Sequence, residues 1–464
     1  MFSDQEDVLF SDLQLEEDTF YFFYVGEIKA DCLNQFVAET LGKVHGRRFE
    51  CISIVPDIIE SYPHRNILVI NPRAKILYNQ TSRKYSCRMG AGEFAVEVSG
   101  SATVRSLAEK LIARQGRLYI HVYESLPQLE LSHMSGAVLL GPEGSLASIW
   151  NNKLYQLQML SGQVPLIDYR VCKDIHELYT SVESVTREWK EGIFVSRAYS
   201  AAGANSFIIR SARELKDREP LSQDTHFISR YVPHDIDPTV LGVVGNEKDV
   251  FIAAIADQEI ENGNMFRGSA FPSSLSHKEQ AEVREHARMV GRALGRSGYR
   301  GIFGCDFIVD HQGRIFFVEV NARKQGTTME MCCTLENALP QGAPSLMEME
   351  YHAVLHNSLP QDRQEIKEAI QGLCWRTYNF KVDREVVTNY FLPVDEDERE
   401  LFRQVRQKGL QHRMIIVEHP GHQRCVLPGS FLGRIVAVGS NREDLDRDIS
   451  LGKFMLEESI TIRE

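Results

Sequence analysis

The sequence lacks the marks of several protein classes. Its nine cysteines are scattered and odd in number, and no two of them form a CxxC pair. A disulfide framework or a zinc site is therefore not expected, and the pattern is typical of a reducing cytosol. No GxGxxG motif is present, so a dinucleotide-binding domain is not predicted. The sequence also shows no internal repeats and no low-complexity tracts.

Positive charge and long apolar runs are also scarce. The chain has 52 basic and 64 acidic residues, and the net charge of −12 argues against nucleic acid or an anionic membrane as the main partner. Apolar runs such as Val250–Ala256 are too short to cross a bilayer. Residues 1–18 hold seven acidic residues and no basic one, so we expect a loose acidic arm without a secretory signal. We therefore predict a cytoplasmic protein.

A chain of 464 residues is too long for one hydrophobic core, so several domains are expected. Over residues 19–145, strand-like runs such as Phe20–Val25 alternate with helix-like runs such as Ser101–Ile112. This order predicts an α/β domain with a mainly parallel sheet. The composition changes after about residue 350, and strand candidates such as Gly433–Gly439 follow polar helices. We predict a C-terminal α+β domain over 351–464.

Residues 301–328, GIFGCDFIVDHQGRIFFVEVNARKQGTT, alternate like a β-hairpin. Glu319 and Asn321 are two residues apart and share a face of the second strand. Asp306 of the first strand can join them if the strands pair. Two carboxylates and an amide oxygen beside Arg323 form a hard-oxygen set suited to Mg²⁺ on a polyphosphate. The alternative is a hairpin whose acidic residues face solvent.

Three further motifs precede this hairpin. They are LLGPEGS at 139–145 with Lys153 after it, FVSRAYSAAGANS at 194–206 and FISRYV at 227–232. In this order the motifs resemble the ATP-grasp superfamily, and specifically its carboxylate–amine ligases. The chain also looks like stand-alone amino-acid and peptide ligases with a pre-ATP-grasp domain.

The resemblance is good over residues 141–328, and before them it concerns only the order of strands and helices. After residue 350 it is faint except for the sequence GRIVAVGSNRED. It implies an N-terminal pre-ATP-grasp domain over 19–145 and an ATP-grasp domain over 146–350. A lid subdomain would occupy about 168–232. The overall fold class is then α/β and α+β multidomain.

The resemblance also implies how ATP is held at its phosphates. Lys153 would contact the phosphates, behind Asn152 where similar proteins have aspartate. Arg197 stands in place of the lysine of the lid strand. The small-residue loop with Ser200 and Gly203 would close over the phosphates, because small residues let backbone N–H groups approach phosphate oxygens. The alternatives without a role in binding are that Lys153 is a surface lysine and that the small-residue loop is an ordinary β-turn.

The adenine and ribose would meet a second group of residues. In similar ligases the strand at Ser229, Arg230, Tyr231 and Val232 presents its backbone to the adenine edge. Ser229 replaces a more usual glutamate. Asp237 stands where an acidic residue often holds the ribose hydroxyls. As a free-standing pattern this is weak, because strands that end at a proline are common.

The resemblance assigns metal and catalytic roles at the end of the hairpin. Asp306, Glu319 and Asn321 would hold one or two Mg²⁺ ions, with Mn²⁺ as an option. Arg323 would stabilise the transferred phosphoryl group or the substrate carboxylate. Arg267, in the stretch MFRGSAFP, would lie near the acyl phosphate; a basic residue on a solvated turn is the alternative.

The implied activity joins a small-molecule carboxylate to an amine, such as an amino acid or peptide. ATP would drive it through an acyl phosphate, with release of ADP and phosphate. One alternative is a biotin-carboxylase-like enzyme, opposed by the sparse glycine of the loop and by the lack of a biotin-attachment tail in this sequence. Another is a silent nucleotide-binding module, supported by Arg197 and Ser229. Dimers are common among similar ligases, so a homodimer is one expected state.

Overall fold

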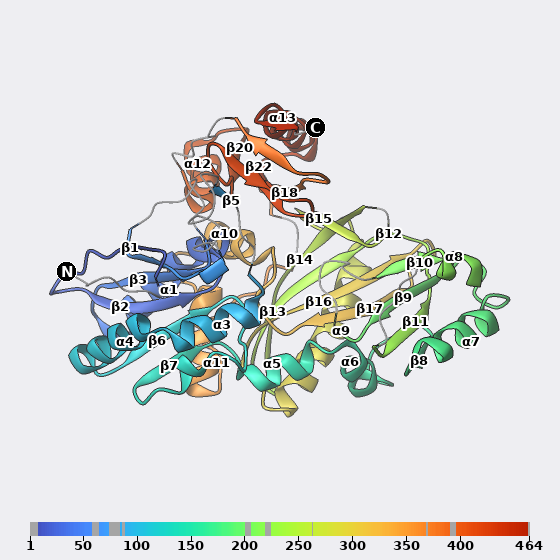
Figure 1. The fold of residues 1–464 in the computed structure, drawn as a ribbon, viewed down its shortest axis with the longest axis horizontal. Coiled ribbons are helices and arrows are strands. Elements are labelled where there is room, and N and C mark those ends of the chain that lie inside the picture. The colour runs from blue at the N-terminus through green and yellow to red at the C-terminus, as the bar shows by residue number, and fades with distance from the viewer. Residues whose placement is uncertain are drawn as a thin grey trace.

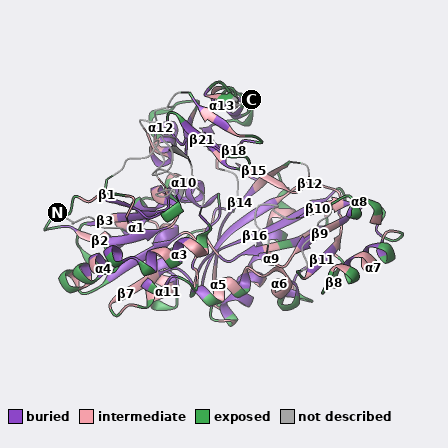
Figure 2. Cartoon of the chain, viewed as in Figure 1, coloured by how far each residue is buried: buried purple, intermediate pink, exposed green. Residues whose placement is uncertain are grey.

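The computed structural model describes residues 8–57, 65–73, 84–85, 89–199, 206–218, 224–261, 263–367, 370–389 and 396–462. Figure 1 shows an N-terminal layer on one side, a long β-rich body on the other and the C-terminal elements above the junction. Strands are largely buried and helices turn one face to solvent (Figure 2). The fold is an α/β multidomain architecture. No helix in these described ranges is long and apolar enough to span a bilayer.

The N-terminal layer is a six-stranded sheet in the order β1-β4-β3-β2-β6-β7. Its strands are β1 (Phe10–Asp12), β2 (Phe20–Val25), β3 (Phe49–Val55), β4 (Ile67–Val69), β6 (Leu118–Val122) and β7 (Ala137–Leu140). All neighbours are parallel except β1 and β4. The sheet is therefore mainly parallel, as predicted. The acidic arm is not wholly loose, because β1 forms an antiparallel edge strand.

Helices cover both faces of this sheet. They are α1 (Asn34–His45), α3 (Ala91–Gly100) and α4 (Ala102–Gln115), with 3₁₀ turns at Ile28–Leu33 and Glu130–His133. Alternate residues of β2 enter different cores: Phe22 packs in the cluster that contains α1, and Phe23 packs with α3 and α4. A strand buried on both faces has a continuous apolar sequence, which explains FYFFYV.

A second, four-stranded sheet occupies residues 169–230. Its antiparallel order is β10-β9-β11-β8, with β8 (Tyr169–Cys172), β9 (Ile193–Arg197), β10 (Phe207–Ile209) and β11 (His226–Arg230). Two helices, α7 (Ile175–Val185) and α8 (Ala212–Lys216), pack on one face in a small apolar cluster. The other face contributes Phe194 and Phe227 to the large cavity described below. We call this unit the lid sheet.

The central sheet has nine strands and joins two distant parts of the chain. Its strands are β12 (His234–Ile236), β13 (Pro238–Asn246), β14 (Asp249–Glu261), β15 (Met265–Phe271), β16 (Gly301–Asp310), β17 (Ile315–Asn321), β18 (Cys374–Lys381), β20 (His412–Val417) and β22 (Phe431–Gly439). The order is β12-β16-β13-β14-β15-β18-β22-β20, with β17 on β16. Phe271 pairs with Trp375, so the C-terminal strands extend this sheet. The C-terminal strands β18, β20 and β22 are therefore part of this sheet, and the domain boundary expected at about residue 350 stays a prediction.

The remaining elements connect and cover these sheets. They are α5 (Gly144–Trp150), α6 (Lys153–Leu160), α9 (His277–Arg296), α10 (Thr328–Ala338), α11 (Leu346–His356), α12 (Glu398–Lys408) and α13 (Arg442–Glu458). A small sheet in the order β23-β19-β21-β5 contains β23 (Ile460–Ile462), β19 (Val386–Thr388), β21 (Arg424–Val426) and β5 (Lys84–Tyr85). The capping box of Ser276 and Glu279 begins α9, and Val283 faces the core as its spacing indicates.

Candidate active site

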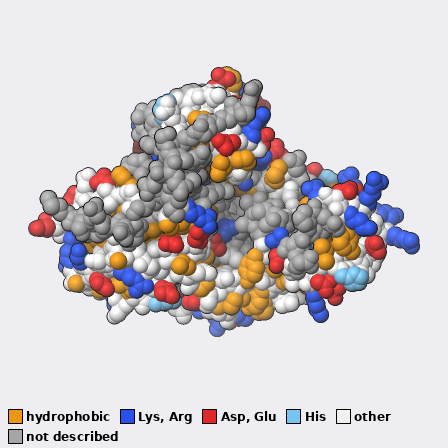
Figure 3. Space-filling view, viewed as in Figure 1, with side chains coloured by type: hydrophobic (Ala, Val, Ile, Leu, Met, Phe, Trp, Pro, Cys, Tyr) orange, Lys and Arg blue, Asp and Glu red, His pale blue; other side chains and the backbone are white. Residues whose placement is uncertain are grey.

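A cavity of about 970 Å³ lies between the lid sheet, the central sheet and the N-terminal layer. Figure 3 shows a hollow in the middle of this face, with basic and acidic side chains gathered at it. The volume is typical of a cofactor or nucleotide pocket. Residues from all three sheets line it, and among them are Asp306, Glu319 and Asn321 of the predicted hairpin.

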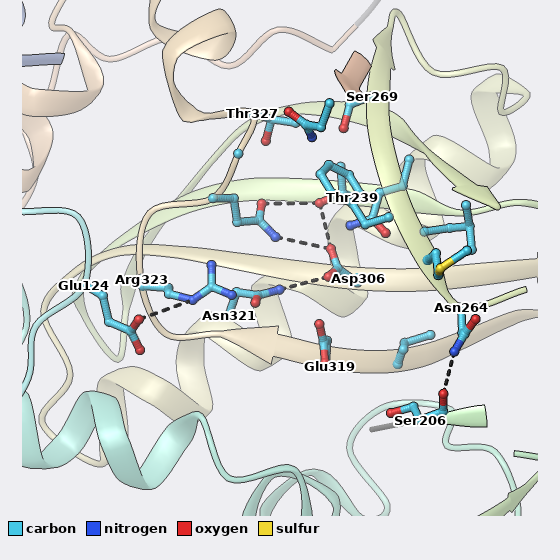
Figure 4. Close-up of a pocket in the computed structure, with 18 of the residues that line it drawn as sticks. Glu124, Ser206, Thr239, Asn264, Ser269, Asp306, Glu319, Asn321, Arg323 and Thr327 are labelled. Carbon is cyan, nitrogen blue, oxygen red and sulfur yellow. Dashed lines mark hydrogen bonds and ion pairs between the residues drawn. The ribbon is translucent and has the colours of Figure 1, made fainter. Parts of the chain in front are cut away.

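The hairpin of β16 and β17 brings the three oxygen-bearing side chains together. In its antiparallel register Asp306 lies opposite Glu319, and Gly304 lies opposite Asn321. The Asn321 amide donates to the Oδ2 atom of Asp306 at 2.8 Å. Figure 4 shows Asp306 and Asn321 joined by this hydrogen bond, with Glu319 nearby. Gly304 leaves room for Gln325, because a Cβ there would lie 1.9 Å from the Gln325 side chain.

The two carboxylates have opposite pKa shifts. Burial and the nearby charge of Glu319 raise the pKa of Asp306 to about 7. The hydrogen-bond partners of Asp306 are neutral: the Thr239 hydroxyl lies 2.7 Å from Oδ1 and the Gln325 amide 3.2 Å from it. Burial also acts to raise the pKa of Glu319, but the charge of Lys153 outweighs it and lowers the pKa. Asp306 is thus a buried carboxylate without a cation of its own.

Lys153 reaches the metal end of the cavity from the first turn of α6. Asn152 caps this helix, and its side chain accepts from the backbone N–H groups of Leu154 and Tyr155. The Lys153 backbone N–H bonds to the Ala198 carbonyl at 2.8 Å, which ties the helix to the lid sheet. The Nζ atom lies 2.6 Å from the Oε2 atom of Glu319. A cation placed this way can contact nucleotide phosphates once its carboxylate partner binds a metal ion.

These residues fit a divalent cation and a polyphosphate. Asp306, Glu319 and Asn321 offer carboxylate and amide oxygens, which are the ligands that Mg²⁺ prefers. A divalent ion would neutralise the negative charge that the carboxylates of Asp306 and Glu319 share. Burial and this charge now raise the pKa of Asp306 and keep it partly protonated. In the described ranges no group of three or more His, Cys, Asp or Glu is placed to hold a metal ion by itself. A metal ion at this site would therefore be bound by these three side chains together with phosphate oxygens.

Arg323 follows β17. It lies on the side of the Asp306 and Glu319 carboxylates that is remote from the lid sheet. Its Nε atom lies 3.9 Å from the Oε2 atom of Glu124, which follows β6 of the N-terminal layer. Asn151 donates to the other oxygen of Glu124 at 2.9 Å and accepts from the Ala322 backbone N–H at 2.9 Å. Figure 4 shows Arg323 between Glu124 and Asn321. The guanidinium is therefore fixed at the cavity by a neighbouring layer.

Lys324 does not line the cavity, although its sequence neighbours Arg323 and Gln325 do. Its ammonium is buried, donates to the Val122 carbonyl at 2.9 Å and lies 2.7 Å from Glu350. The Lys324 backbone N–H also bonds to the Tyr123 carbonyl. These contacts lock the chain after β17 onto the end of β6, and they hold Arg323 in place.

The predicted adenine segment lines the other end of the cavity. Ser229, Arg230, Tyr231, Val232 and Asp237 all contribute to the lining. The Tyr231 N–H bonds to the Gly192 carbonyl at 3.0 Å, and the Arg230 guanidinium lies 3.1 Å from Asp168. The apolar side chains beside this segment can contact a planar base; they are Leu157, Ile167, Phe194, Phe227 and Ile308.

Asp237 has a partner that its sequence position does not reveal. The Nε2 atom of His234 lies 2.9 Å from the Oδ1 atom of Asp237, and the Nδ1 atom lies 2.6 Å from the Val232 carbonyl. Burial acts to lower the pKa of His234, but Asp237 outweighs it and raises the pKa. A ribose bound at Asp237 would therefore hydrogen-bond to a carboxylate that also contacts the imidazole of His234.

Two predicted cations do not reach the cavity lining. Arg197 lies on the same face of β9 as Ile193 and Val195, which pack in the lid core, and its guanidinium lies 3.4 Å from Asp224. Ser196 is on the other face and bonds to Ser206 at 2.9 Å. Strand alternation thus turns Arg197 away from the site. The predicted loop residues Ser200 and Gly203 lie outside the described residues.

Arg267 is also directed away from this site. It belongs to β15, but its Nε atom lies 2.5 Å from the Oε2 atom of Glu261, and the residue does not line the cavity. Its neighbours Phe266 and Ser269 do line it. Of the four predicted cations, Lys153 and Arg323 are thus the two that line the cavity with Asp306 and Glu319.

Several cavity residues carry no sequence motif. Glu124, Thr239, Gln258 and Gln325 all line the cavity, and the last three support Asp306. Gln325 lies in the sequence Lys-Gln-Gly-Thr-Thr after Arg323, and no pattern in that stretch singles it out. The others are isolated polar residues in apolar strands or after them.

Comparison with known proteins agrees with this geometry. Residues 151–327 match the family model described as the ATP-grasp domain. The chain is 25% identical over 171 residues to butirosin acyl-carrier protein–L-glutamate ligase of Niallia circulans, covering 36% of the chain and 41% of that protein. It is 30% identical over 120 residues to L-propargylglycine–L-glutamate ligase of Streptantibioticus cattleyicolor, covering 26% and 24%. The match thus spans less than half the length of either relative.

The whole fold is shared with solved structures. Biotin carboxylase from Campylobacter jejuni superposes with a TM-score of 0.61 at 14% identity, covering 96% of this chain and 92% of that one. At this identity the likeness concerns the fold alone. Residues 151–327 are therefore an ATP-grasp domain, and over this part the chain is similar to carboxylate–amine ligases.

Proposed function

We propose that this protein is an ATP-dependent carboxylate–amine ligase that forms an amide or peptide bond. The observation that carries the proposal is the pairing of buried Asp306 with half-buried Glu319 in one cavity with Lys153 and Arg323. A carboxylate would attack the γ-phosphorus of ATP, forming an acyl phosphate and releasing ADP. An amine would then attack the acyl carbon, lose a proton and displace phosphate.

The nucleotide would lie along the cavity from the lid sheet to the metal pair. The segment from Ser229 to Val232 would border the adenine, and Asp237 the ribose. The Nζ atom of Lys153 lies 2.6 Å from Glu319, and it would exchange this contact for one with the phosphates. Asp306, Glu319 and Asn321 would hold Mg²⁺, or Mn²⁺ in its place. The metal ion would offset the negative charge of the phosphates during phosphoryl transfer.

Arg323 is the residue that we assign to the acyl group. It lies past Asn321 at the side of the cavity formed by the N-terminal layer, away from the lid sheet. A guanidinium there can orient the attacking carboxylate and then stabilise the oxyanion that forms when the amine attacks. Glu124 and Lys324 are positioning residues, because they fix the side chain and the backbone of this segment.

Phosphate release from Mg-ATP tests the proposal directly. Purified full-length protein should release phosphate only when a carboxylate and an amine are both present, and pairs of amino acids form the first panel. Mass spectrometry should find the condensed product in the same samples. Bicarbonate with biotin forms a separate arm, because the fold is shared with a biotin carboxylase. Release in that arm alone, or nucleotide binding with no release in any arm, would contradict the ligase assignment.

The oligomeric state and the cellular location both stay predictions. A homodimer can be tested by sedimentation equilibrium of the full chain. A cytoplasmic location can be tested by fractionation of the source cells. Neither bears on the chemistry proposed for the cavity.

A further inference from the structure

His234 lies between the two parts of the predicted nucleotide site. It begins the edge strand β12 and lines the cavity between the adenine segment and Asp237. Its side chain is 12% exposed. The ring of Tyr231 lies 6.2 Å from the imidazole, and Asp310 of β16 lies opposite His234 in the strand pairing. The imidazole therefore has a fixed place in the wall of the cavity.

Both ring nitrogens of His234 face oxygen atoms that accept hydrogen bonds. The Nδ1 atom lies 2.6 Å from the Val232 carbonyl, and the Nε2 atom lies 2.9 Å from the Oδ1 atom of Asp237. A carbonyl oxygen and an ionised carboxylate have no proton to donate, so each contact needs a proton on the ring. A neutral imidazole has one N–H group, and either tautomer would set a ring lone pair against an oxygen. The geometry thus fits the doubly protonated ring.

Two carboxylates act to keep the second proton on this imidazole. Burial lowers its pKa, but the hydrogen bond and charge of Asp237 and the charge of Asp235 outweigh burial and raise the pKa. Asp235 also pairs with His311, whose Nδ1 atom lies 2.7 Å from it. On the neighbouring strand Asp310 accepts from Arg314 at 2.7 Å, and that pair brings one charge of each sign. The charge that these neighbours place around the ring is therefore negative in sum.

The backbone of Asp237 is fixed, so its carboxylate can turn only about the side-chain bonds. The Asp237 carbonyl accepts from the Gln258 backbone N–H at 2.8 Å. Pro238 follows directly and begins β13, and a residue before proline is restricted to extended backbone. The contact between His234 and the Oδ1 atom therefore orients a carboxylate that lines the cavity.

We propose that His234 is a positioning residue for the ribose of the bound nucleotide, and that the proton between its Nε2 atom and Asp237 controls nucleotide affinity. The protonated ring holds the carboxylate in the orientation in which ribose hydroxyls donate to it. A deprotonated ring sets a lone pair against the Oδ1 atom, and the carboxylate turns out of that orientation. This inference rests on the nucleotide binding that belongs to the proposed function.

A second titration at the other end of the cavity must be separated from this one. The pKa of Asp306 is about 7, and that residue lies at the proposed metal and phosphate end. A plain pH profile of ADP affinity would therefore mix the two groups. ADP and 2′,3′-dideoxy-ADP have the same phosphates and differ in the ribose hydroxyls. The ratio of their dissociation constants therefore reports the ribose contact.

Calorimetry of the full chain with the magnesium complexes of ADP and 2′,3′-dideoxy-ADP at pH 6 and pH 9 measures this ratio. In the wild type the dideoxy compound should bind about tenfold more weakly at pH 6, as expected for hydrogen bonds to a charged acceptor. At pH 9 the ratio should fall to about threefold or less, because the imidazole has lost its second proton. This measurement on the wild type tests the proposal without any variant.

His234→Gln is the variant that removes the titration. Its amide donates a hydrogen bond but has no pKa in this range, so the ratio should be the same at pH 6 and pH 9. His311→Gln is the matched control, because His311 also contacts a carboxylate but is exposed and does not line the cavity. This control should keep the fall of the wild type. A merely structural role for His234 would weaken both compounds equally and leave the wild-type ratio independent of pH.

Three results would overturn this role: a wild-type ratio that does not change with pH, a ratio near one at both pH values, or a fall that persists in His234→Gln. The ligase proposal fails separately. If the ratio behaves as expected but no pair of substrates supports phosphate release, the role of His234 stands and the ligase activity falls. If ligation occurs and the ratio is constant, the ligase activity stands and the role of His234 falls. Failure of both compounds to bind would overturn both.

Discussion

Replacing Asp306 by asparagine should stabilise the ligand-free protein at alkaline pH and abolish its turnover. Asp306 has neutral hydrogen-bond partners and faces Glu319 across the hairpin. Its ionised form is therefore costly until a metal ion arrives. Asparagine keeps the shape of the side chain and removes the charge. The same change removes a ligand that the proposed chemistry needs.

The size of the gain follows from the pKa of Asp306, which is about 7 against an ordinary value of 3.8. Because the native state holds this proton more tightly than the unfolded chain, the free energy of unfolding falls as the pH rises from about 4 to about 7. About three pKa units correspond to about 4 kcal/mol. Asparagine loses one acceptor for the Asn321 amide, at about 1 kcal/mol. We expect a net gain of about 3 kcal/mol at pH 8 and less than about 1 kcal/mol at pH 5.

Urea unfolding of the full chain without nucleotide or Mg²⁺ at pH 5 and pH 8 measures this gain. Asp310→Asn is the control, because Asp310 lies on the same strand. Burial acts to raise the pKa of Asp310, but its hydrogen bonds and ion pair with Arg314 outweigh it and lower the pKa. That variant should be less stable than wild type at pH 8. An Asp306→Asn protein that gains nothing at pH 8, or gains equally at both pH values, would refute the reasoning.

Four further substitutions test the cations and the second carboxylate. Glu319→Gln should abolish phosphate release while the ligand-free protein still unfolds cooperatively, and residual wild-type activity would remove Glu319 from the metal site. Arg323→Lys should lower kcat by about 10² without changing the affinity for ADP, because the guanidinium acts on the acyl group; an equal loss of ADP affinity would place it at the nucleotide. Arg197→Ala and Arg267→Ala should leave the KM for ATP within about threefold of wild type, since both side chains form ion pairs away from the cavity and surface pairs contribute little. A tenfold rise in KM would show that the lid closes with these residues inward.

The pairing of Asp306 with Glu319 could be predicted because its geometry is local. The two strands of the hairpin are joined by a short turn, so the alternation of side chains nearly fixes which residues face each other. Asp306 opposite Glu319 follows from that rule. Lys153 could be predicted for a similar reason: Asn152 is a good N-cap residue, which places the lysine in the first turn of a helix.

The orientation of Arg197 could not be predicted, because it depends on a single step of alternation. In the sequence Ile-Phe-Val-Ser-Arg each face of the strand has apolar side chains, so the pattern does not say which face packs on α7. The structure puts Ile193 and Val195 in that core, and Arg197 goes with them. A shift of one residue would have turned the arginine toward the phosphates. A cation in a strand is thus a weaker prediction than a cation at a helix start.

Four polar residues of the cavity wall could not be found in the sequence either, because they meet only through the register of strands that are far apart in the chain. Thr239, Gln258, Ser269 and Thr377 are each a lone polar residue in a mostly apolar strand. Their alignment requires β15 to pair with β18, and the two are separated by α9, the hairpin and two more helices. This pairing makes the C-terminal strands part of the cavity wall. Changes in β18 and β22 should therefore alter which substrates are accepted, whereas changes in the hairpin should alter whether ATP is used at all.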